Sequence, residues 1–142
     1  MIRVYADIVG DLFHRGHVEF LKKTKNIGED VFLVIGVHSD EDCEDYKRKP
    51  IFTMEDRCEI FRSCRNVDEV IPNAPLRITE DFLNEHSIDI VVHGDDMTDF
   101  HRNVNYFVPI QKNIMRYIPY YDSISTTQII KRIVDGFKKE DN

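Results

Sequence analysis

The chain has 142 residues and a formal net charge of −7, from 26 acidic and 19 basic side chains, so it suits a single domain and lacks the basic balance of a general nucleic-acid-binding protein. Its three cysteines form no C-x-x-C pair, which argues against zinc and disulfide frameworks and favours reduced thiols in the cytoplasm. No apolar run reaches the roughly 18 residues of a membrane span, and the chain enters a strand pattern at once, which leaves no room for a signal peptide.

Strand and helix patterns alternate along the whole chain. In chain order they predict a strand (2–8), a helix (17–28), a strand (31–38), a polar irregular segment (39–52), a helix capped by Thr53, a strand (67–71), a helix capped by Thr79, a strand (88–92), a mixed loop and helix (99–113), a strand (115–118) and a helix capped by Ser125 that ends at residue 137. Residues 138–142 follow as a polar tail. The alternation predicts one α/β domain over residues 1–137, with a doubly wound, Rossmann-like parallel sheet.

Three polar segments follow predicted strands: residues 11–17, 93–96 and 122–127. Parallel strands bring their carboxyl ends to one edge of the sheet, and doubly wound sheets bind ligands at that edge. We therefore expect these three segments, which lie far apart in the sequence, to enclose one pocket.

The segment His14-Arg15-Gly16-His17 carries the strongest chemical signal. A helix that begins there offers unpaired N–H groups and the positive end of its dipole to a phosphate. Gly16 has no Cβ, so a phosphate can approach the backbone, and histidines three residues apart can face one ligand. The structural alternative is that His17 caps the helix and His14 packs beside it.

Six blocks of the sequence stand in an order and spacing typical of one enzyme family. They are residues 3–17, 36–41, Lys47 with 50–53, 67–75, 93–96 and 124–127. Together they resemble the cytidylyltransferases that make CDP-choline and CDP-ethanolamine, within the HxGH nucleotidyltransferase superfamily. The resemblance covers nearly the whole chain. It implies transfer of CMP from CTP to phosphoethanolamine or phosphocholine, release of pyrophosphate, Mg²⁺ bound with CTP rather than by protein ligands, and a homodimer.

The resemblance also implies a role for each matching residue. His14 and His17 would bind phosphates and stabilise charge as pyrophosphate leaves. Lys47 would bridge the acceptor phosphate and the α-phosphate of CTP, and Asp7 would also contact the acceptor. Arg48 and Lys49 are expected to be solvated or auxiliary. The implied nucleotide contacts come from Asp11, Gly16, Arg57, His93, Gly94, Asp95, Ile124, Ser125, Thr126 and Thr127. Asp95 is favoured over its neighbour Asp96.

The chain departs from the family pattern at three places. The early glycine is displaced, with residues 8–10 between the two aspartates. Tyr120 replaces an arginine, and Leu76 replaces a tryptophan of choline-type members. A quaternary ammonium prefers an aromatic cage, so Leu76 argues against phosphocholine as the acceptor unless another aromatic ring takes the place of the missing tryptophan. The candidate rings are Tyr46, Tyr106 and Tyr120.

Three alternatives to this function stay open. Glycerol 3-phosphate is a possible acceptor, because bacterial enzymes that use it share the same blocks. An adenylyltransferase of the same superfamily is possible, although residues 67–70 and 124–127 favour CTP. Because the family arginine is replaced at Tyr120, the non-enzymatic alternative is a nucleotide-binding module with little turnover.

Overall fold

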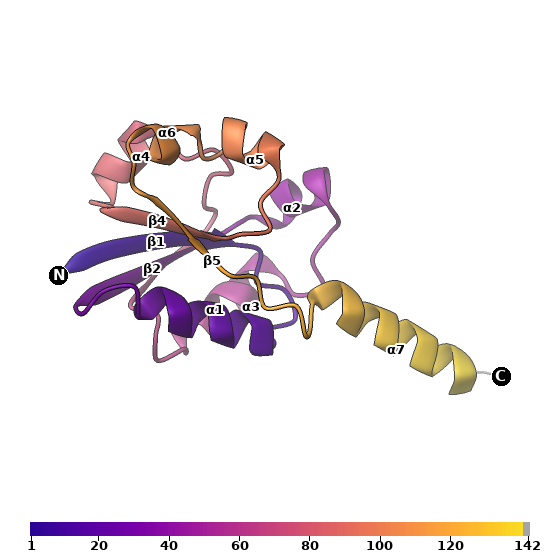
Figure 1. Ribbon diagram of the computed structural model, residues 1–142. Coiled ribbons are helices and arrows are strands. Elements are labelled where there is room, and N and C mark those ends of the chain that lie inside the picture. The colour runs from indigo at the N-terminus through magenta and orange to yellow at the C-terminus, as the bar shows by residue number, and fades with distance from the viewer. Residues whose placement is uncertain (141–142) are drawn as a thin grey trace.

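The computed structural model describes residues 1–140, with the backbone alone at 139 and 140. Five strands and seven helices follow one another in this part of the chain (Figure 1). They are β1 (Ile2–Ile8), α1 (Arg15–Lys25), β2 (Val31–Val37), α2 (Asp40–Tyr46), α3 (Met54–Arg62), β3 (Glu69–Ile71), α4 (Glu80–Glu85), β4 (Ile90–Gly94), α5 (Asp99–Val104), α6 (Phe107–Gln111), β5 (Met115–Ile118) and α7 (Thr126–Glu140).

The strands form one sheet in the order β3-β2-β1-β4-β5, and every pair is parallel. The chain winds outward from β1 in one direction through β2 and β3, and then in the other through β4 and β5. The order therefore reverses between β1 and β4, where the carboxyl ends of these strands leave a crevice for a ligand. This topology confirms the predicted doubly wound α/β fold.

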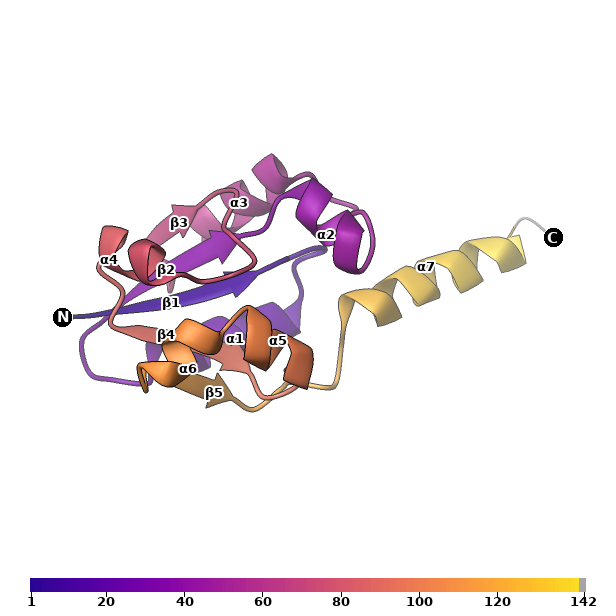
Figure 2. The same ribbon diagram turned by 90° about the horizontal axis from the view of Figure 1, so that it is seen from above.

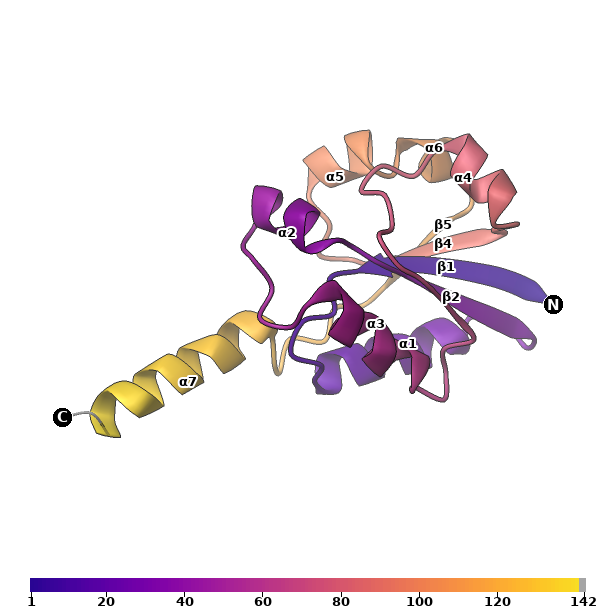
Figure 3. The same ribbon diagram turned by 180° about the vertical axis from the view of Figure 1, so that it is seen from behind.

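Helices cover both faces of the sheet (Figure 3). Val4 and Ala6 of β1 pack with Phe61 of α3 in one core cluster, against α1 and α3. Tyr5 points to the opposite face and packs with Phe82 of α4 in a second cluster. Successive strand residues alternate between the two faces, so a strand buried on both is apolar throughout. The helix α7 leaves this body and projects beyond the carboxyl ends of the strands (Figure 2).

The structure differs from the sequence prediction in three segments. Residues 39–52, predicted to be irregular, contain α2. Two effects stabilise this helix: Ser39 Oγ accepts a hydrogen bond from the Asp42 amide, and three acidic residues occupy the first turn, where the helix dipole favours negative charge. The strand predicted over 88–92 lies two residues later, as β4. The last helix runs past 137 to Glu140, so part of the predicted tail is helical, and residues 141–142 lie outside the described residues.

Within residues 1–140, no helix has both the length and the apolar character needed to cross a membrane.

Candidate active site

A cleft of about 270 Å³, here called the central cleft, opens at the carboxyl ends of β1 and β4. Its polar donors come from the starts of α1 and α7 and from the α2–α3 connection. Its carboxylates come from β1 and from the segment after β4, and further rings come from β4 and from the segment after β5. Eleven of the predicted site residues line it: Asp7, His14, Gly16, His17, Lys47, His93, Gly94, Ile124, Ser125, Thr126 and Thr127. The three polar segments thus meet at one edge of the sheet, as the topology predicts.

The two histidines at the start of α1 both cap the helix and line the central cleft. His14 Nδ1 accepts a hydrogen bond from the Gly16 amide at 2.9 Å, and His17 Nδ1 accepts one from the His14 amide at 3.0 Å. An imidazole nitrogen that accepts carries no proton, so in each neutral ring the proton lies on Nε2. The ring centroids are 4.0 Å apart. The capping contacts therefore fix two Nε2–H donors side by side.

Burial keeps both imidazoles uncharged. It lowers the pKa of His17 to about 4, with the neighbouring His14 adding to the shift and Asp11 opposing it. Burial also lowers the pKa of His14. At neutral pH the pair therefore offers hydrogen-bond donors rather than cations, and it can stabilise developing negative charge without first losing a proton.

Gly16 has a structural role that the sequence did not reveal. A Cβ at this position would lie 2.6 Å from Cε1 of His14. The space that glycine leaves is thus filled by the imidazole of His14, which is how that ring can cap the helix. The sequence predicted that this space would let a phosphate approach the backbone. In the structure the ring of His14 occupies the space.

The start of α7 is tied to the loop after β1 and to the α2–α3 connection. Thr126 Oγ1 donates to the Asp11 carbonyl oxygen at 2.9 Å, and the Arg48 guanidinium donates to Thr127 Oγ1 at 3.2 Å. Ser125 Oγ accepts from the Gln128 amide, which caps the helix. These contacts hold the first turn of α7 against the central cleft.

Lys47 lines the central cleft and also a neighbouring cavity of about 480 Å³, here called the side hollow. The two spaces share Asp7, Ile8, Lys47, His93 and Asp96. A ligand in one space and a ligand in the other would therefore meet beside the ammonium group of Lys47. Lys47 is the residue directly after the last residue of α2, the helix that the sequence analysis did not predict.

Asp7 is a buried carboxylate that faces both spaces. The hydroxyl of Tyr106 donates to Asp7 Oδ1 at 2.5 Å, and His38 Nε2 lies 3.5 Å from Oδ2. Oδ2 has no hydrogen-bond partner among the described residues. Burial, reinforced by the Asp7 carboxylate, raises the pKa of Tyr106 well above its usual value, so this phenol stays a donor. An unsatisfied buried carboxylate oxygen that lines a cavity is suited to bind a cation.

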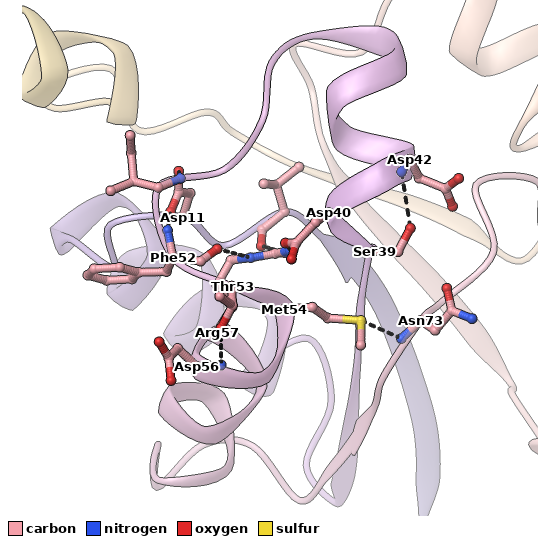
Figure 4. Close-up of polar contacts among 12 residues, drawn as sticks. Asp11, Ser39, Asp40, Asp42, Phe52, Thr53, Met54, Asp56, Arg57 and Asn73 are labelled. Atoms are coloured by element: carbon pink, nitrogen blue, oxygen red, sulfur yellow. Dashed lines mark hydrogen bonds and ion pairs between the residues drawn. The ribbon is translucent and has the colours of Figure 1, made fainter.

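Arg57 and Asp11 do not contact the central cleft, which corrects their predicted roles as nucleotide ligands. The Arg57 side chain is 0% exposed and donates to the Val9 and Phe52 carbonyls and to Asp40, at 2.6, 3.1 and 2.7 Å. The Asp11 carboxylate accepts from the amides of Leu12, Ile51 and Phe52. Figure 4 shows both side chains directed at the loops that frame the site. Both side chains therefore hold the loops that frame the site, and Asp11 also lines a small hollow beside the central cleft.

Replacing Arg57 with methionine should lower the free energy of unfolding by about 3 kcal/mol, because the carbonyls of Val9 and Phe52 and the carboxylate of Asp40 would lose their donor. Urea denaturation measures this. Arg62→Met is the matched control on the same helix: its partner Glu59 is exposed, so the expected change is below about 1 kcal/mol. Equal effects of the two substitutions would contradict the buried role of Arg57.

Of the two adjacent aspartates, the structure places the second in the central cleft. Asp95 Oδ1 accepts from the Tyr120 amide at 2.9 Å, so this carboxylate ties β4 to the segment after β5. Asp96 lines both the central cleft and the side hollow. The prediction favoured Asp95, whose carboxylate has a structural contact here, while Asp96 is the aspartate of the two that lines the cleft; which of them contacts a nucleotide stays a prediction.

Seven residues that line the central cleft were not predicted as site residues, and Lys23 and Tyr120 are two of them. Lys23 lies seven residues after Gly16, two helical turns along the same face of α1, and that spacing could have identified it. Tyr120 was recognised only as the residue that replaces an arginine, and its side chain lines the cleft. In the part of the chain that the structure describes, no three His, Cys, Asp or Glu side chains form a group that could hold a metal ion.

Comparison with known proteins agrees with this geometry. A family model described as cytidylyltransferase-like matches residues 11–132. The chain belongs to the cytidylyltransferase-like family. It is 37% identical to choline-phosphate cytidylyltransferase A of Mus musculus over 145 residues, and 35% identical to ethanolamine-phosphate cytidylyltransferase of Dictyostelium discoideum over 138 residues. These similarities confirm the resemblance found in the six sequence blocks.

The matches cover most of this chain but a smaller part of each relative. The alignments take in 96% and 94% of the chain, and 37% and 38% of the two relatives. The chain thus spans little more than a third of their length. A solved structure, the lipopolysaccharide core biosynthesis protein from Thermoplasma volcanium GSS1, superposes with a TM-score of 0.69 at 28% identity, over 86% of this chain and 99% of that one.

Proposed function

We propose that this member of the cytidylyltransferase-like family transfers the cytidylyl group of CTP to a small phosphomonoester and releases pyrophosphate. The observation that carries the proposal is that Lys47 lines the boundary between two cavities, one of which also holds the paired imidazoles. A nucleotide in the central cleft and an acceptor in the side hollow would meet at this cation. Such an arrangement is needed when one phosphate attacks another, because their charges repel.

The reaction needs no covalent intermediate with the protein. An oxygen of the acceptor phosphate attacks the α-phosphorus of CTP, the bond from that phosphorus to the bridging oxygen breaks, and pyrophosphate leaves. Lys47 offsets the repulsion between the two phosphates during attack. The Nε2–H groups of His14 and His17 donate to phosphate oxygens on which negative charge accumulates.

Mg²⁺ fits this proposal as an ion that arrives with the triphosphate. The described residues offer isolated carboxylates near the cleft rather than a ligand cage, and Mg²⁺ commonly keeps several waters and binds through substrate phosphates. When bound, the ion would neutralise part of the phosphate charge. Asp96, in the central cleft, is the carboxylate best placed to reach its hydration shell.

The side hollow favours an acceptor that carries a positive charge. Tyr46, His101 and Tyr106 line the hollow together with Asp7, whose buried carboxylate has one oxygen without a hydrogen-bond partner among the described residues. A carboxylate with aromatic rings suits the ammonium group of phosphoethanolamine or phosphocholine. Glycerol 3-phosphate has no cation to offset the buried charge of Asp7. Leu76 also lines the hollow, so one wall is aliphatic where an aromatic ring was expected from choline-type relatives.

The proposal is tested by a panel of acceptors with CTP and Mg²⁺, scored by pyrophosphate release. We expect release with phosphoethanolamine or phosphocholine at a rate at least about tenfold above that with glycerol 3-phosphate, since a lost charge-assisted hydrogen bond costs about 1.5–3 kcal/mol. ATP in place of CTP tests the adenylyl alternative. Release with ATP but not with CTP would overturn the assignment of the nucleotide.

A nucleotide-binding module with little turnover is the second candidate, because Tyr120 stands in the cleft where the family pattern has an arginine. The same panel separates the two. CTP binding by calorimetry without pyrophosphate release from any acceptor would favour the module, whereas release above the no-enzyme background would exclude it.

We also propose that the protein forms a homodimer in the cytoplasm. The resemblance to the cytidylyltransferases supports the dimer, and Ile133, Val134 and Phe137 of α7 are exposed apolar side chains that association would cover. The three cysteines are free thiols, which supports a reducing compartment. Light scattering on the purified chain gives the oligomeric state.

A further inference from the structure

The basic cluster Lys47-Arg48-Lys49 connects α2 to α3, and its three side chains lie in different surroundings. Lys47 lines the boundary between the central cleft and the side hollow, whereas Lys49 is exposed and lines neither space. Arg48 is half-buried and reaches across to the start of α7, 79 residues away in the sequence, where one of its N–H groups donates to Thr127 Oγ1 at 3.2 Å. Of the two surroundings expected for Arg48, solvated or auxiliary, this contact with the first turn of α7 favours the auxiliary one.

Arg48 uses only a small part of its hydrogen-bonding capacity. A guanidinium carries five N–H donors in a planar fork, and the contact with Thr127 occupies one of them. Among residues 1–138, no carboxylate lies within 4.0 Å of Arg48, although the chain carries an excess of acidic side chains. Arg57, in contrast, donates to two backbone carbonyls and to the carboxylate of Asp40. A half-buried guanidinium without an anionic partner is suited to bind an anion from solution.

The position of Arg48 indicates which anion it can reach. With Lys47, His17 and Thr126, it lines a small hollow of about 160 Å³, and these three neighbours also line the central cleft. Arg48 does not line the side hollow, where the acceptor is proposed to lie. The small hollow also adjoins the side hollow, through Val9 and Tyr46. Thr127, the partner of Arg48, lines the central cleft and not the side hollow, so a phosphate beside Arg48 would sit next to the central cleft.

We propose that Arg48 binds the terminal β- and γ-phosphates of the nucleotide, with its guanidinium turning from Thr127 to chelate two phosphate oxygens. This inference rests on the proposed function. If Lys47 holds the α-phosphate at the boundary with the side hollow, the rest of the triphosphate would extend through the central cleft toward the start of α7, where Arg48 contacts Thr127. When the bond to the α-phosphorus breaks, the charge that develops on the leaving pyrophosphate is then stabilised by Arg48. It is a ligand of the leaving group, distinct from Lys47 at the reacting phosphate.

The experiment compares the affinities of CTP, CMP and inorganic pyrophosphate for the wild-type chain and for Arg48→Gln by calorimetry. Loss of a charged donor to phosphate should weaken CTP and pyrophosphate binding about 10- to 100-fold and leave CMP binding within about twofold. Arg48→Lys should restore only part of the loss, because an ammonium cannot chelate two oxygens in the same plane. Lys49→Gln removes the same charge one residue away and should change none of the three affinities.

Each other outcome has a definite meaning. Equal weakening of CTP and CMP would show that Arg48 only ties the loop to α7, and unchanged CTP binding would show that it is solvated; either result overturns the inference. A wild-type chain that binds pyrophosphate but not CTP would overturn the proposed function, while a loss of pyrophosphate binding in Arg48→Gln would still support Arg48 as a phosphate ligand. A wild-type chain that binds neither would overturn both.

Discussion

Lys47→Ala should lower kcat for pyrophosphate release by about 10²- to 10³-fold while weakening CTP binding by less than about tenfold. The reason is its place at the boundary between the central cleft and the side hollow, where two phosphates approach each other only in the reacting complex. An interaction that matters most during attack affects the rate more than the affinity. Single-turnover rates and calorimetry measure the two effects separately.

The matched control for this substitution is Lys49→Ala, which removes the same charge from an exposed position outside both spaces. It should leave kcat within about twofold. If Lys47→Ala kept the wild-type rate, or if its entire effect appeared in CTP affinity, the bridging role of Lys47 would be wrong.

His17→Ala should also lower kcat by about 10²- to 10³-fold, because it removes an Nε2–H donor from the place where charge accumulates. In the wild-type chain His17 Nδ1 accepts from the His14 amide, so the substitution removes a helix cap as well. The free energy of unfolding should therefore also fall by about 1 kcal/mol.

His17→Gln serves as the second variant in this test. Its side-chain oxygen can accept the capping bond and its amide carries N–H donors, so it should keep the wild-type stability and recover part of the rate lost in His17→Ala. Pyrophosphate release and urea denaturation are measured on both variants. Turnover of His17→Ala within a few-fold of the wild type would show that His17 is only a helix cap.

Most of the fold follows from patterns that the sequence displays openly. The apolar run of β2 and the Thr53 cap of α3 are local signals, and the alternation of strands and helices fixes a doubly wound sheet. The segment 39–52 was misjudged because its helix is short and acidic, with one buried side chain, Cys43, and no apolar period. Capping by Ser39 and the helix dipole stabilise α2, and hydrophobic periodicity does not detect either effect.

The site could be predicted where a residue's role follows from its backbone position, and less well where it depends on side-chain direction. His14, His17 and Thr126 meet in the central cleft because the topology brings the starts of α1 and α7 to one edge. Arg57 and Asp11 occupy that edge too, yet their side chains turn toward backbone groups of neighbouring loops. A sequence motif does not distinguish a ligand from the residue that holds the ligand's loop in place.

The departure from the family pattern after β1 also has a structural explanation. Gly10 adopts a positive φ of 70°, and a Cβ there would lie within 2.2 Å of Phe61 Cε2. The displaced glycine therefore supplies both the left-handed backbone and the room that the loop needs beneath α3. The loop still delivers Asp11 to the amides of Ile51 and Phe52, so the frame of the site is kept.

A crystal structure of the chain with CTP and Mg²⁺ tests the central claim most directly. We expect the triphosphate to lie in the central cleft with phosphate oxygens within hydrogen-bond distance of Nε2 of both His14 and His17, and the Lys47 ammonium beside the α-phosphate. A nucleotide bound elsewhere, or one in this cleft with its phosphates turned away from both imidazoles, would contradict the account.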